Sequence, residues 1–373
     1  MRARLVLALW VCLAGSAPLH AQEWDSIRGA VEKVGEPGPH WFLARGRNIG
    51  YLVDGDAGEV LGTMTLSMFT PAMRPHLAAD RIYAYGSYYS RTYYGDRTDV
   101  VTFFDRETMA PVDEVIIPPK SAGIGHSGMI GLVDDRFLGV WNITPAMSVS
   151  MVDVRARKFI GEISTPGCAM VYPLGRGFLM PCGDGTLQYV ALKGDGTEAS
   201  RMRSEVFFSV SDDPVFDYAV PTKDGWLFIT LDGLVREATL AGGRIVLSEP
   251  WSLFGTDERT AEDDEGWRIG GGQMFAYNAP TGLLVTLMHE GGGQETFEEP
   301  GTEVWAFNLA TKRRGYRLEL DGEASSIGLT ADASPLLVVM PDEGGTMELR
   351  DAMTGALKRT MKDMRVGMMQ PLQ

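Results

Sequence analysis

The sequence has no apolar run long enough to cross a bilayer, which takes about 20 residues. Its first residues instead follow the order of a secretory signal. Arg2 and Arg4 precede an apolar stretch over residues 5–14, and Leu19-His20-Ala21 resembles a cleavage site. We therefore expect residues 1–21 to be a signal peptide and residues 22–373 to form a single domain that works outside the cytoplasm, without a membrane anchor.

Positive charge is scarce. Lys and Arg total 34 against 49 Asp and Glu, a formal net charge of −15. Removing Arg2 and Arg4 with the signal leaves −17. Such a surface argues against nucleic acid and anionic membranes as partners, because both select for clustered Lys and Arg. It favours a cationic small substrate or a basic partner, although solubility alone also accounts for it.

Histidine and catalytic motifs are equally sparse. One of the five histidines, His20, lies in the signal, and the others are isolated in the sequence: His40, His76, His126 and His289. There is no HExxH, GxSxG or Walker motif. No helix start follows Gly270-Gly-Gly272, as a phosphate loop would need. The sequence therefore predicts no catalytic residue, no metal site and no cofactor site on this chain.

Only three cysteines occur, and Cys12 belongs to the signal. Cys168 and Cys182 are placed symmetrically about Gly175, within a turn over residues 173–177. In an antiparallel hairpin they would face each other at about 5 Å between Cα atoms, close enough for a disulfide. Because the segment has no CxxC motif and no neighbouring histidine, we predict a structural disulfide and no redox or metal role.

Glycine is abundant at 45 residues, with 20 prolines and no helical period, which is typical of many short strands and tight turns. A strand, a polar turn and a second strand recur around positions 54, 105, 153, 191, 239, 308 and 351. Most intervals span 38 to 51 residues, the size of a four-stranded propeller blade. The prediction is an all-β, seven-bladed β-propeller. Its inner strands, buried on both faces between adjacent blades, would be the apolar runs at residues 82–85, 137–141, 177–180, 226–230, 283–287 and 336–340.

The longest interval, 239 to 308, contains extra sequence: an acidic run over residues 257–265 and the glycines at 291–293. Loops inserted between blades often bind partners, although a solvated loop is the simpler interpretation. A second unusual segment holds half of the 12 tyrosines, between Tyr83 and Tyr94. We place Tyr88 to Tyr94 in a loop, where they either form an interface or pack on their own blade.

This tyrosine segment contains a motif. The stretch Ser90-Arg-Thr-Tyr-Tyr-Gly95-Asp-Arg97-Thr-Asp99, followed by a strand ending in Phe104-Asp105, resembles the heavy chain of methylamine and aromatic amine dehydrogenases. Three further blocks resemble the same family: residues 53–58, the cysteine hairpin with residues 183–187, and residues 266–271.

The resemblance implies a seven-bladed propeller in a periplasmic heterotetramer of two heavy and two light chains. It also implies that the cofactor, tryptophan tryptophylquinone, and the catalytic base belong to a small disulfide-rich light chain. An electron acceptor, a small copper protein or a cytochrome c, would complete the partners. Family heavy chains wall the amine channel with an aromatic residue, and Met68 or Phe69 occupies that place in this sequence.

Three functions follow as hypotheses. The first is the heavy subunit of a quinoprotein amine dehydrogenase that deaminates primary amines oxidatively, in which this chain is scaffold, channel wall and docking surface. The second is an autonomous propeller hydrolase similar to a lactonase, with carboxylates and histidine at the channel mouth. The third is a non-catalytic periplasmic binding propeller.

Overall fold

A computed structural model describes residues 33–119, 126–255, 264–342 and 345–372. All of them belong to one compact unit, Lys33–Gln373. The predicted signal peptide lies outside the described residues, as do residues 257–263 of the acidic run. No helix among the described residues is long and apolar enough to cross a membrane.

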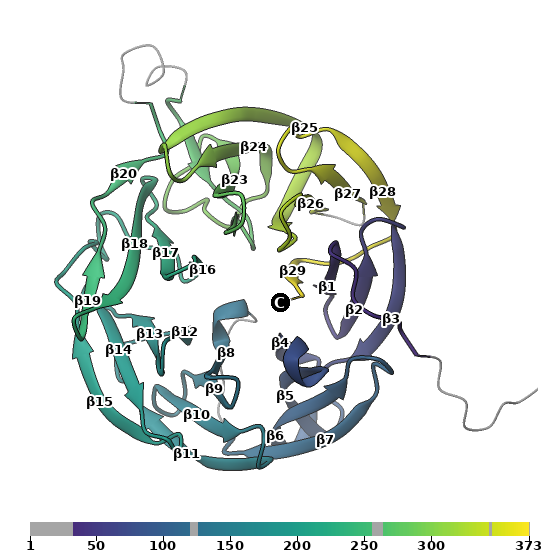
Figure 1. Cartoon of the computed structure of the whole chain (residues 1–373), viewed down its shortest axis with the longest axis vertical. Coiled ribbons are helices and arrows are strands. Elements are labelled where there is room, and N and C mark those ends of the chain that lie inside the picture. The colour runs from purple at the N-terminus through teal and green to yellow at the C-terminus, as the bar shows by residue number, and fades with distance from the viewer. Residues whose placement is uncertain (1–32, 120–125, 256–263, 343–344, 373) are drawn as a thin grey trace, which may run out of the picture. The chain divides into compact units, whose positions relative to one another are not determined.

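The described chain is an all-β propeller whose sheets are arranged around a central axis (Figure 1). Its helices are two short 3₁₀ turns, η1 (Leu77–Ala79) and η2 (Ser127–Met129). The C-terminal strand closes the ring by pairing with the first strand, β1. Sheet one has the order β29 (Met368–Pro371), β1 (Trp41–Arg45), β2 (Ile49–Asp54) and β3 (Glu59–Thr65); sheet two has β4 (Phe69–His76), β5 (Arg81–Arg91), β6 (Tyr94–Asp105) and β7 (Pro111–Ile117).

The next three sheets follow the same antiparallel order along the chain. Sheet three holds β8 (Ile130–Val133), β9 (Phe137–Asn142), β10 (Ser148–Asp153) and β11 (Lys158–Ser164). Sheet four holds β12 (Tyr172–Leu174), β13 (Gly177–Pro181), β14 (Leu187–Leu192) and β15 (Glu198–Arg203). Sheet five holds β16 (Val220–Pro221), β17 (Gly225–Ile229), β18 (Leu234–Ala241) and β19 (Arg244–Leu247), with β20 (Trp251–Ser252) also on β18.

The remaining strands form one continuous eight-stranded sheet, so the prediction of seven separate blades is wrong as stated. Five blades are separate sheets. The large sheet runs from β21 (Trp267–Ile269) and β22 (Phe275–Asn278), both on β23 (Leu283–Glu290), through β24 (Gly301–Asn308), β25 (Arg313–Leu329), β26 (Leu336–Pro341) and β27 (Thr346–Asp351) to β28 (Leu357–Lys362). The cause is the 17-residue β25, which pairs with β24 and then with β26 without an intervening turn.

The apolar runs that we predicted to be inner strands are strands, and they lie second from the axis. They belong to β5, β9, β13, β17, β23 and β26. The strands β4, β8, β12, β16 and β29 lie nearest the axis (Figure 1), and β22 is the corresponding neighbour of β23. The second strand is covered on both faces by neighbouring sheets, and β9 and β13 are buried throughout. Innermost strands border the axis instead, so they need less apolar sequence.

The repeated polar turns have a common hydrogen-bond pattern. Asp54, Asp153 and Asp351 each end a strand, and one carboxylate oxygen accepts bonds from the backbone N–H groups two and three residues later. Asn308 accepts from Thr311 in the same way. Such Asx turns close the hairpin locally, which is why the sequence repeat was visible without tertiary information.

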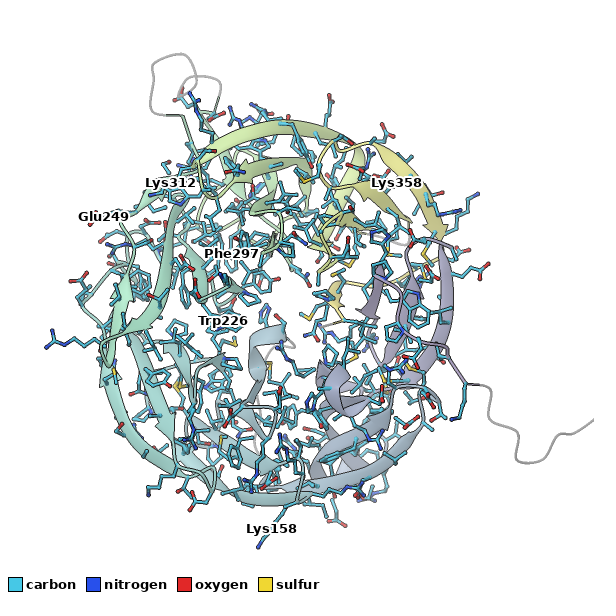
Figure 2. The ribbon with its side chains drawn as sticks, viewed as in Figure 1. Lys158, Trp226, Glu249, Phe297, Lys312 and Lys358 are labelled. Carbon is cyan, nitrogen blue, oxygen red and sulfur yellow. A yellow bond between two sulfur atoms is a disulfide. The ribbon has the colours of Figure 1, made fainter. Side chains whose placement is uncertain are left out.

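The hydrophobic core lies between the faces of neighbouring sheets. The largest cluster extends across the second to fifth sheets and includes Tyr83, Trp141, Phe178 and Phe228. Charged side chains lie at the periphery, such as Lys158, Lys312 and Lys358, while Trp226 and Phe297 lie nearer the axis (Figure 2). This arrangement leaves the functional surfaces to the two ends of the ring and to its centre.

His40 joins the first sheet to the eight-stranded sheet. Its Nδ1 lies 2.7 Å from an Asp56 carboxylate oxygen, and its Nε2 lies 3.0 Å from the Ser334 carbonyl and 3.3 Å from Asp332. Burial opposes protonation, but the Asp56 and Ser334 hydrogen bonds and the Asp332 charge outweigh it, so the pKa of His40 is raised.

A raised folded-state pKa means that His40 stabilises the fold below the ordinary histidine pKa and that this contribution is lost as the pH rises through the raised value. We therefore expect His40→Gln to destabilise the protein more at about pH 5.5 than at about pH 8.5 in urea unfolding. His76 is the control, because burial and the nearby Arg155 and Arg74 lower its pKa. His76→Gln should show the opposite pH trend; parallel trends would contradict the assignment.

Candidate functional site

Phe69 lies where the chain enters the second sheet, at the first residue of β4. The preceding Ser67 is buried, and its hydroxyl accepts the Phe69 N–H at 3.0 Å while donating to the Ser87 carbonyl of β5. The turn around Met68 is thereby held against the neighbouring strand. Both predicted channel residues are partly buried.

Phe69 is part of an aromatic cluster with two tyrosines from the β5–β6 hairpin. Its ring centroid lies 5.1 Å from that of Tyr89 and 6.2 Å from that of Tyr93, both in edge-to-face geometry. Tyr93 and Tyr94 remain more than 60% exposed. The structure thus brings together the channel residue and the tyrosine segment, which sequence reasoning had treated separately.

The tyrosines lie on a protruding hairpin, not in the loop that we predicted. β5 and β6 pair from Arg81↔Asp105 to Arg91↔Tyr94, whereas their neighbours β4 and β7 pair only as far as Ser87 and Asp99. The tip therefore extends beyond its own sheet and leaves Tyr88, Tyr93 and Tyr94 exposed. A protruding aromatic tip is typical of a protein–protein interface.

An ion pair braces the base of this hairpin. Arg97 donates to both carboxylate oxygens of Asp99 at 2.7 Å and to the Ser87 hydroxyl at 2.9 Å. Asp99 is fully buried, and its hydrogen bond raises the pKa of Arg97. The Arg-Thr-Asp motif thus fixes the hairpin where it leaves the sheet.

A cavity of about 490 Å³ opens at the same end of the ring, and we call it the mouth cavity. It is lined by residues that precede several innermost strands or lie in loops beside them, including Arg45, His126, Asp217, Phe297 and Glu298. The Arg45 guanidinium donates to the Pro71 carbonyl at 2.7 Å, which connects the cavity to the Phe69 segment. His126 lies 3.4 Å from the Asp217 carboxylate.

Sequence reasoning missed most of this mouth. His126 was noticed only as an isolated histidine, and Arg45, Asp217 and Phe297 belong to no motif. The glycines at 291–293 lie in the β23–β24 loop that also carries Phe297, so part of the inserted sequence borders the cavity. The amides of Gly270, Gly271 and Gly272 all donate to protein carbonyls and leave no N–H for an anion.

The structure contains the predicted Cys168–Cys182 disulfide at this end of the ring, with a Cα separation of 4.0 Å. The two cysteines face each other beyond the β12–β13 hairpin, whose turn includes Gly175 in the left-handed region at φ 54°. The Cys168 carbonyl also accepts the Trp141 indole N–H at 3.1 Å. The disulfide thus fixes the segment that leads into sheet four.

Replacing both cysteines with serine is expected to lower the free energy of unfolding by about 3 kcal/mol, because a closed loop of this length restricts the unfolded chain. Urea unfolding checks the value. Dithiothreitol should reduce the stability of the unmodified protein by a similar amount and leave the double variant unchanged. An unchanged midpoint for the double variant would contradict the prediction.

The histidines noted in the sequence do not assemble into a common site. His40 lies at the opposite end of the ring, His76 is buried against Tyr83, and His289 is buried in β23. Among the described residues, no group of three or more His, Cys, Asp or Glu side chains is placed to hold a metal ion.

The fold, with its Phe69 cluster and mouth cavity, can be compared with known proteins. The family model "Methylamine dehydrogenase heavy chain (MADH)" matches residues 34–369. The chain belongs to this family. It is 27% identical over 312 residues to the methylamine dehydrogenase heavy chain of Methylorubrum extorquens, covering 82% of this chain and 74% of the relative. The heavy chain from Paracoccus versutus is 28% identical over 318 residues, covering 83% and 72%.

Solved structures agree with the propeller fold. A dihydro-heme d1 dehydrogenase, NirN, matches with a TM-score of 0.57 at 15% identity, covering 91% of this chain and 76% of that one. The β-propeller domain of Cps50 (Swd1) from Myceliophteria thermophila matches at 0.54 and 11% identity, covering 85% and 97%. At these identities the likeness shows the fold alone.

Proposed function

We propose that this chain is the heavy subunit of a periplasmic quinoprotein amine dehydrogenase, which deaminates primary amines oxidatively. The observation that carries the proposal is the family match over residues 34–369, together with the aromatic cluster at the position of the predicted channel wall. The family's heavy-chain name implies a light chain. In this proposal the light chain carries tryptophan tryptophylquinone and the catalytic base.

The face with the Phe69 cluster and the mouth cavity is the proposed docking surface for the light chain. Exposed tyrosines supply rigid contact area at low entropic cost, as interfaces require. When the light chain is bound, the quinone supplies the oxidation. This chain forms the wall of the amine channel. The backbone of Phe69 is held by the Ser67 hydroxyl, the Phe69 ring narrows the channel, and Met68 lies beside it. In this proposal a small copper protein or a cytochrome c is the electron acceptor of the assembled enzyme.

The acidic surface supports the choice of substrate. With 49 acidic against 34 basic residues, the chain raises the local concentration of cations such as alkylammonium ions. The effect depends on long-range charge and is screened by salt. The amine's identity is set by the channel wall.

We infer further that the eight-stranded sheet acts as two blades, which gives the ring seven. From Arg313 to Glu319, β25 is the outer partner of β24; Ala324 pairs with both β24 and β26, and the residues from Ser326 onward pair with β26. Leu329, at its end, lines the central cavity as other innermost strands do.

The test is co-expression of the full chain with a small, cysteine-rich light chain and its maturation factors. We expect the two chains to co-purify, to show quinone absorbance and to reduce a dye only when a primary amine is added. A heavy chain that binds no light chain in this experiment would overturn the proposal. A lone chain that hydrolyses lactones with a stoichiometric metal would favour the hydrolase.

A further inference from the structure

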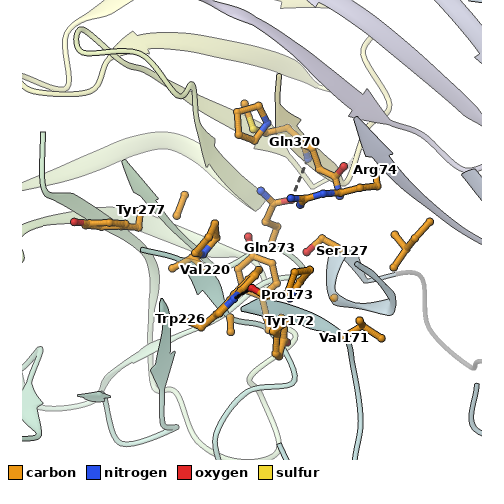
Figure 3. A pocket seen from close by; sticks show the side chains of 18 of the residues that line it. Arg74, Ser127, Val171, Tyr172, Pro173, Val220, Trp226, Gln273, Tyr277 and Gln370 are labelled. Carbon is orange, nitrogen blue, oxygen red and sulfur yellow. Dashed lines mark hydrogen bonds between the residues drawn. The ribbon is translucent and has the colours of Figure 1, made fainter. Parts of the chain in front are cut away.

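A second cavity lies on the axis of the ring, and we call it the central cavity. Its volume is about 100 Å³. Residues on or beside the innermost strands of every sheet line it, so it belongs to no single blade. Its polar lining includes Tyr218 and, as Figure 3 shows, Arg74, Ser127, Gln273 and Gln370. Among the described residues, the lining contains one cation and no carboxylate.

Arg74 carries this single charge on β4. The side chain as a whole is partly buried. Its Nε is buried and has no hydrogen-bond partner, and among the described residues Arg74 forms no ion pair within 4 Å. Burial lowers the pKa of Arg74, and the charge of Asp135 offsets this effect only in part. Elsewhere in this acidic chain many arginines contact a carboxylate within 4 Å, for example Arg97, Arg136 and Arg350. A buried guanidinium nitrogen without a hydrogen-bond partner is costly, and an anion from solution would remove that cost.

Two side-chain amides lie beside the Arg74 guanidinium. Gln273 accepts the Met369 N–H through Oε1 at 3.0 Å, which leaves its Nε2 as a donor. Gln370 is 8% exposed, and its Oε1 is buried with no hydrogen-bond partner. A half-turn of this amide would exchange the unpartnered oxygen for an NH₂ donor. Figure 3 shows Arg74 of β4, Gln370 of β29 and Gln273, which precedes β22, lying close together.

Four lining residues are aromatic, and the polar groups of Tyr172 and Trp226 are already hydrogen-bonded. Tyr172 donates its hydroxyl to the Asp217 carbonyl at 2.9 Å, and the Trp226 indole N–H donates to the Pro173 carbonyl at 2.7 Å. These side chains therefore present mainly ring surface to the cavity. The site combines one planar cation, amide donors and an apolar wall.

We propose that the central cavity binds one small monocarboxylate, of the size of formate or acetate, with Arg74 as its counter-charge. A guanidinium fork matches the two oxygens of a carboxylate, and the aromatic wall accepts a methyl group. The volume is below the roughly 150 Å³ of a cavity that holds benzene, whereas one water needs about 10–15 Å³. It is too small for an aromatic acid. A doubly charged phosphate would find only one positive charge, and a cation would find no carboxylate.

The site is separate from the proposed amine channel. Its residues line the axis, whereas Phe69, Tyr89 and Tyr93 cluster beside the mouth. Binding there would bridge strands from different sheets, so the ligand would stabilise the ring. The proposal does not depend on the enzymatic function.

The full chain is purified in a buffer whose only anion is a bulky sulfonate, which exceeds the cavity. Formate, acetate, propionate, benzoate and phosphate are then titrated at constant ionic strength. We expect formate and acetate to raise the melting temperature saturably, by about 2 °C at a tenfold excess over Kd. Carbon-13 acetate should show one saturable site by NMR. Benzoate and phosphate should have no saturable effect.

Arg74→Met should abolish the acetate effect and should melt at or above the unmodified protein in sulfonate, because it removes an unpaired buried charge. Arg74→Lys keeps the charge without the fork and should weaken binding by about tenfold. Arg244→Met, on the exposed outer strand β19, is the matched control and should respond to acetate normally. An equal acetate response in Arg74→Met, or a benzoate response equal to that of acetate, would overturn the proposal. So would saturable binding of phosphate alone. If Arg74→Met does not fold, Arg74→Lys and the NMR titration decide.

Discussion

Replacing Asp99 with alanine is expected to lower the free energy of unfolding by about 3–5 kcal/mol, measured by urea unfolding. The carboxylate is fully buried and takes two hydrogen bonds from Arg97, whose side chain is about one quarter exposed. Removing it leaves a partly buried cation without its partner and frees the hairpin where it leaves the sheet. The same change should weaken light-chain binding, because the exposed tyrosines are carried on that hairpin.

The control for Asp99 is an ion pair of the same geometry that is more exposed to solvent. Arg201 donates to both oxygens of Glu198 at 2.7 and 2.6 Å, but the side chains are 38% and 29% exposed. Replacing Glu198 with alanine should therefore cost less than about 1 kcal/mol. If both variants lose the same small amount, the Arg97–Asp99 pair does not brace the hairpin.

Phe69→Ala in the assembled enzyme should change which amine is preferred. Removing the ring from the aromatic cluster widens the proposed channel, so the ratio of kcat/KM for a bulky arylalkylamine to that for methylamine should rise by about tenfold or more. Steady-state dye reduction with both amines measures this ratio. A ratio is used because a general loss of folding lowers both values together.

Two further variants complete the Phe69 test. Met68→Ala asks whether the neighbouring side chain shares the role. Met353→Ala, at an exposed turn between β27 and β28, should leave the ratio unchanged. If neither Phe69→Ala nor Met68→Ala alters the preference, this segment does not form the channel wall.

Sequence reasoning succeeded where the determining interactions are local. Each Asp or Asn of the repeated turns bonds to N–H groups two or three residues away, so the pattern could be read from one strand pair at a time. The disulfide joins residues 14 apart across one hairpin, and symmetry about Gly175 was sufficient to pair them. The family match confirms the resemblance that rested on the Arg-Thr-Asp block.

Sequence reasoning failed where packing between distant segments determines the structure. The predicted blades were not found as seven separate sheets, because β25 continues from one strand partner to the next without turn residues to mark a boundary. The tyrosine segment was assigned to a loop, although its strands pair through to Arg91 and Tyr94.

The sequence by itself determined the all-β repeat, the disulfide and the family. Each of these depends on residues that lie close together along the chain. Only the tertiary structure placed Phe69 against Tyr89 and Tyr93, assembled the mouth cavity, and left the buried Nε of Arg74 without a hydrogen-bond partner among the described residues. Closing the ring brings residues from every sheet to one axis. The surroundings of a charge there are set by segments hundreds of residues apart, and no local pattern records them.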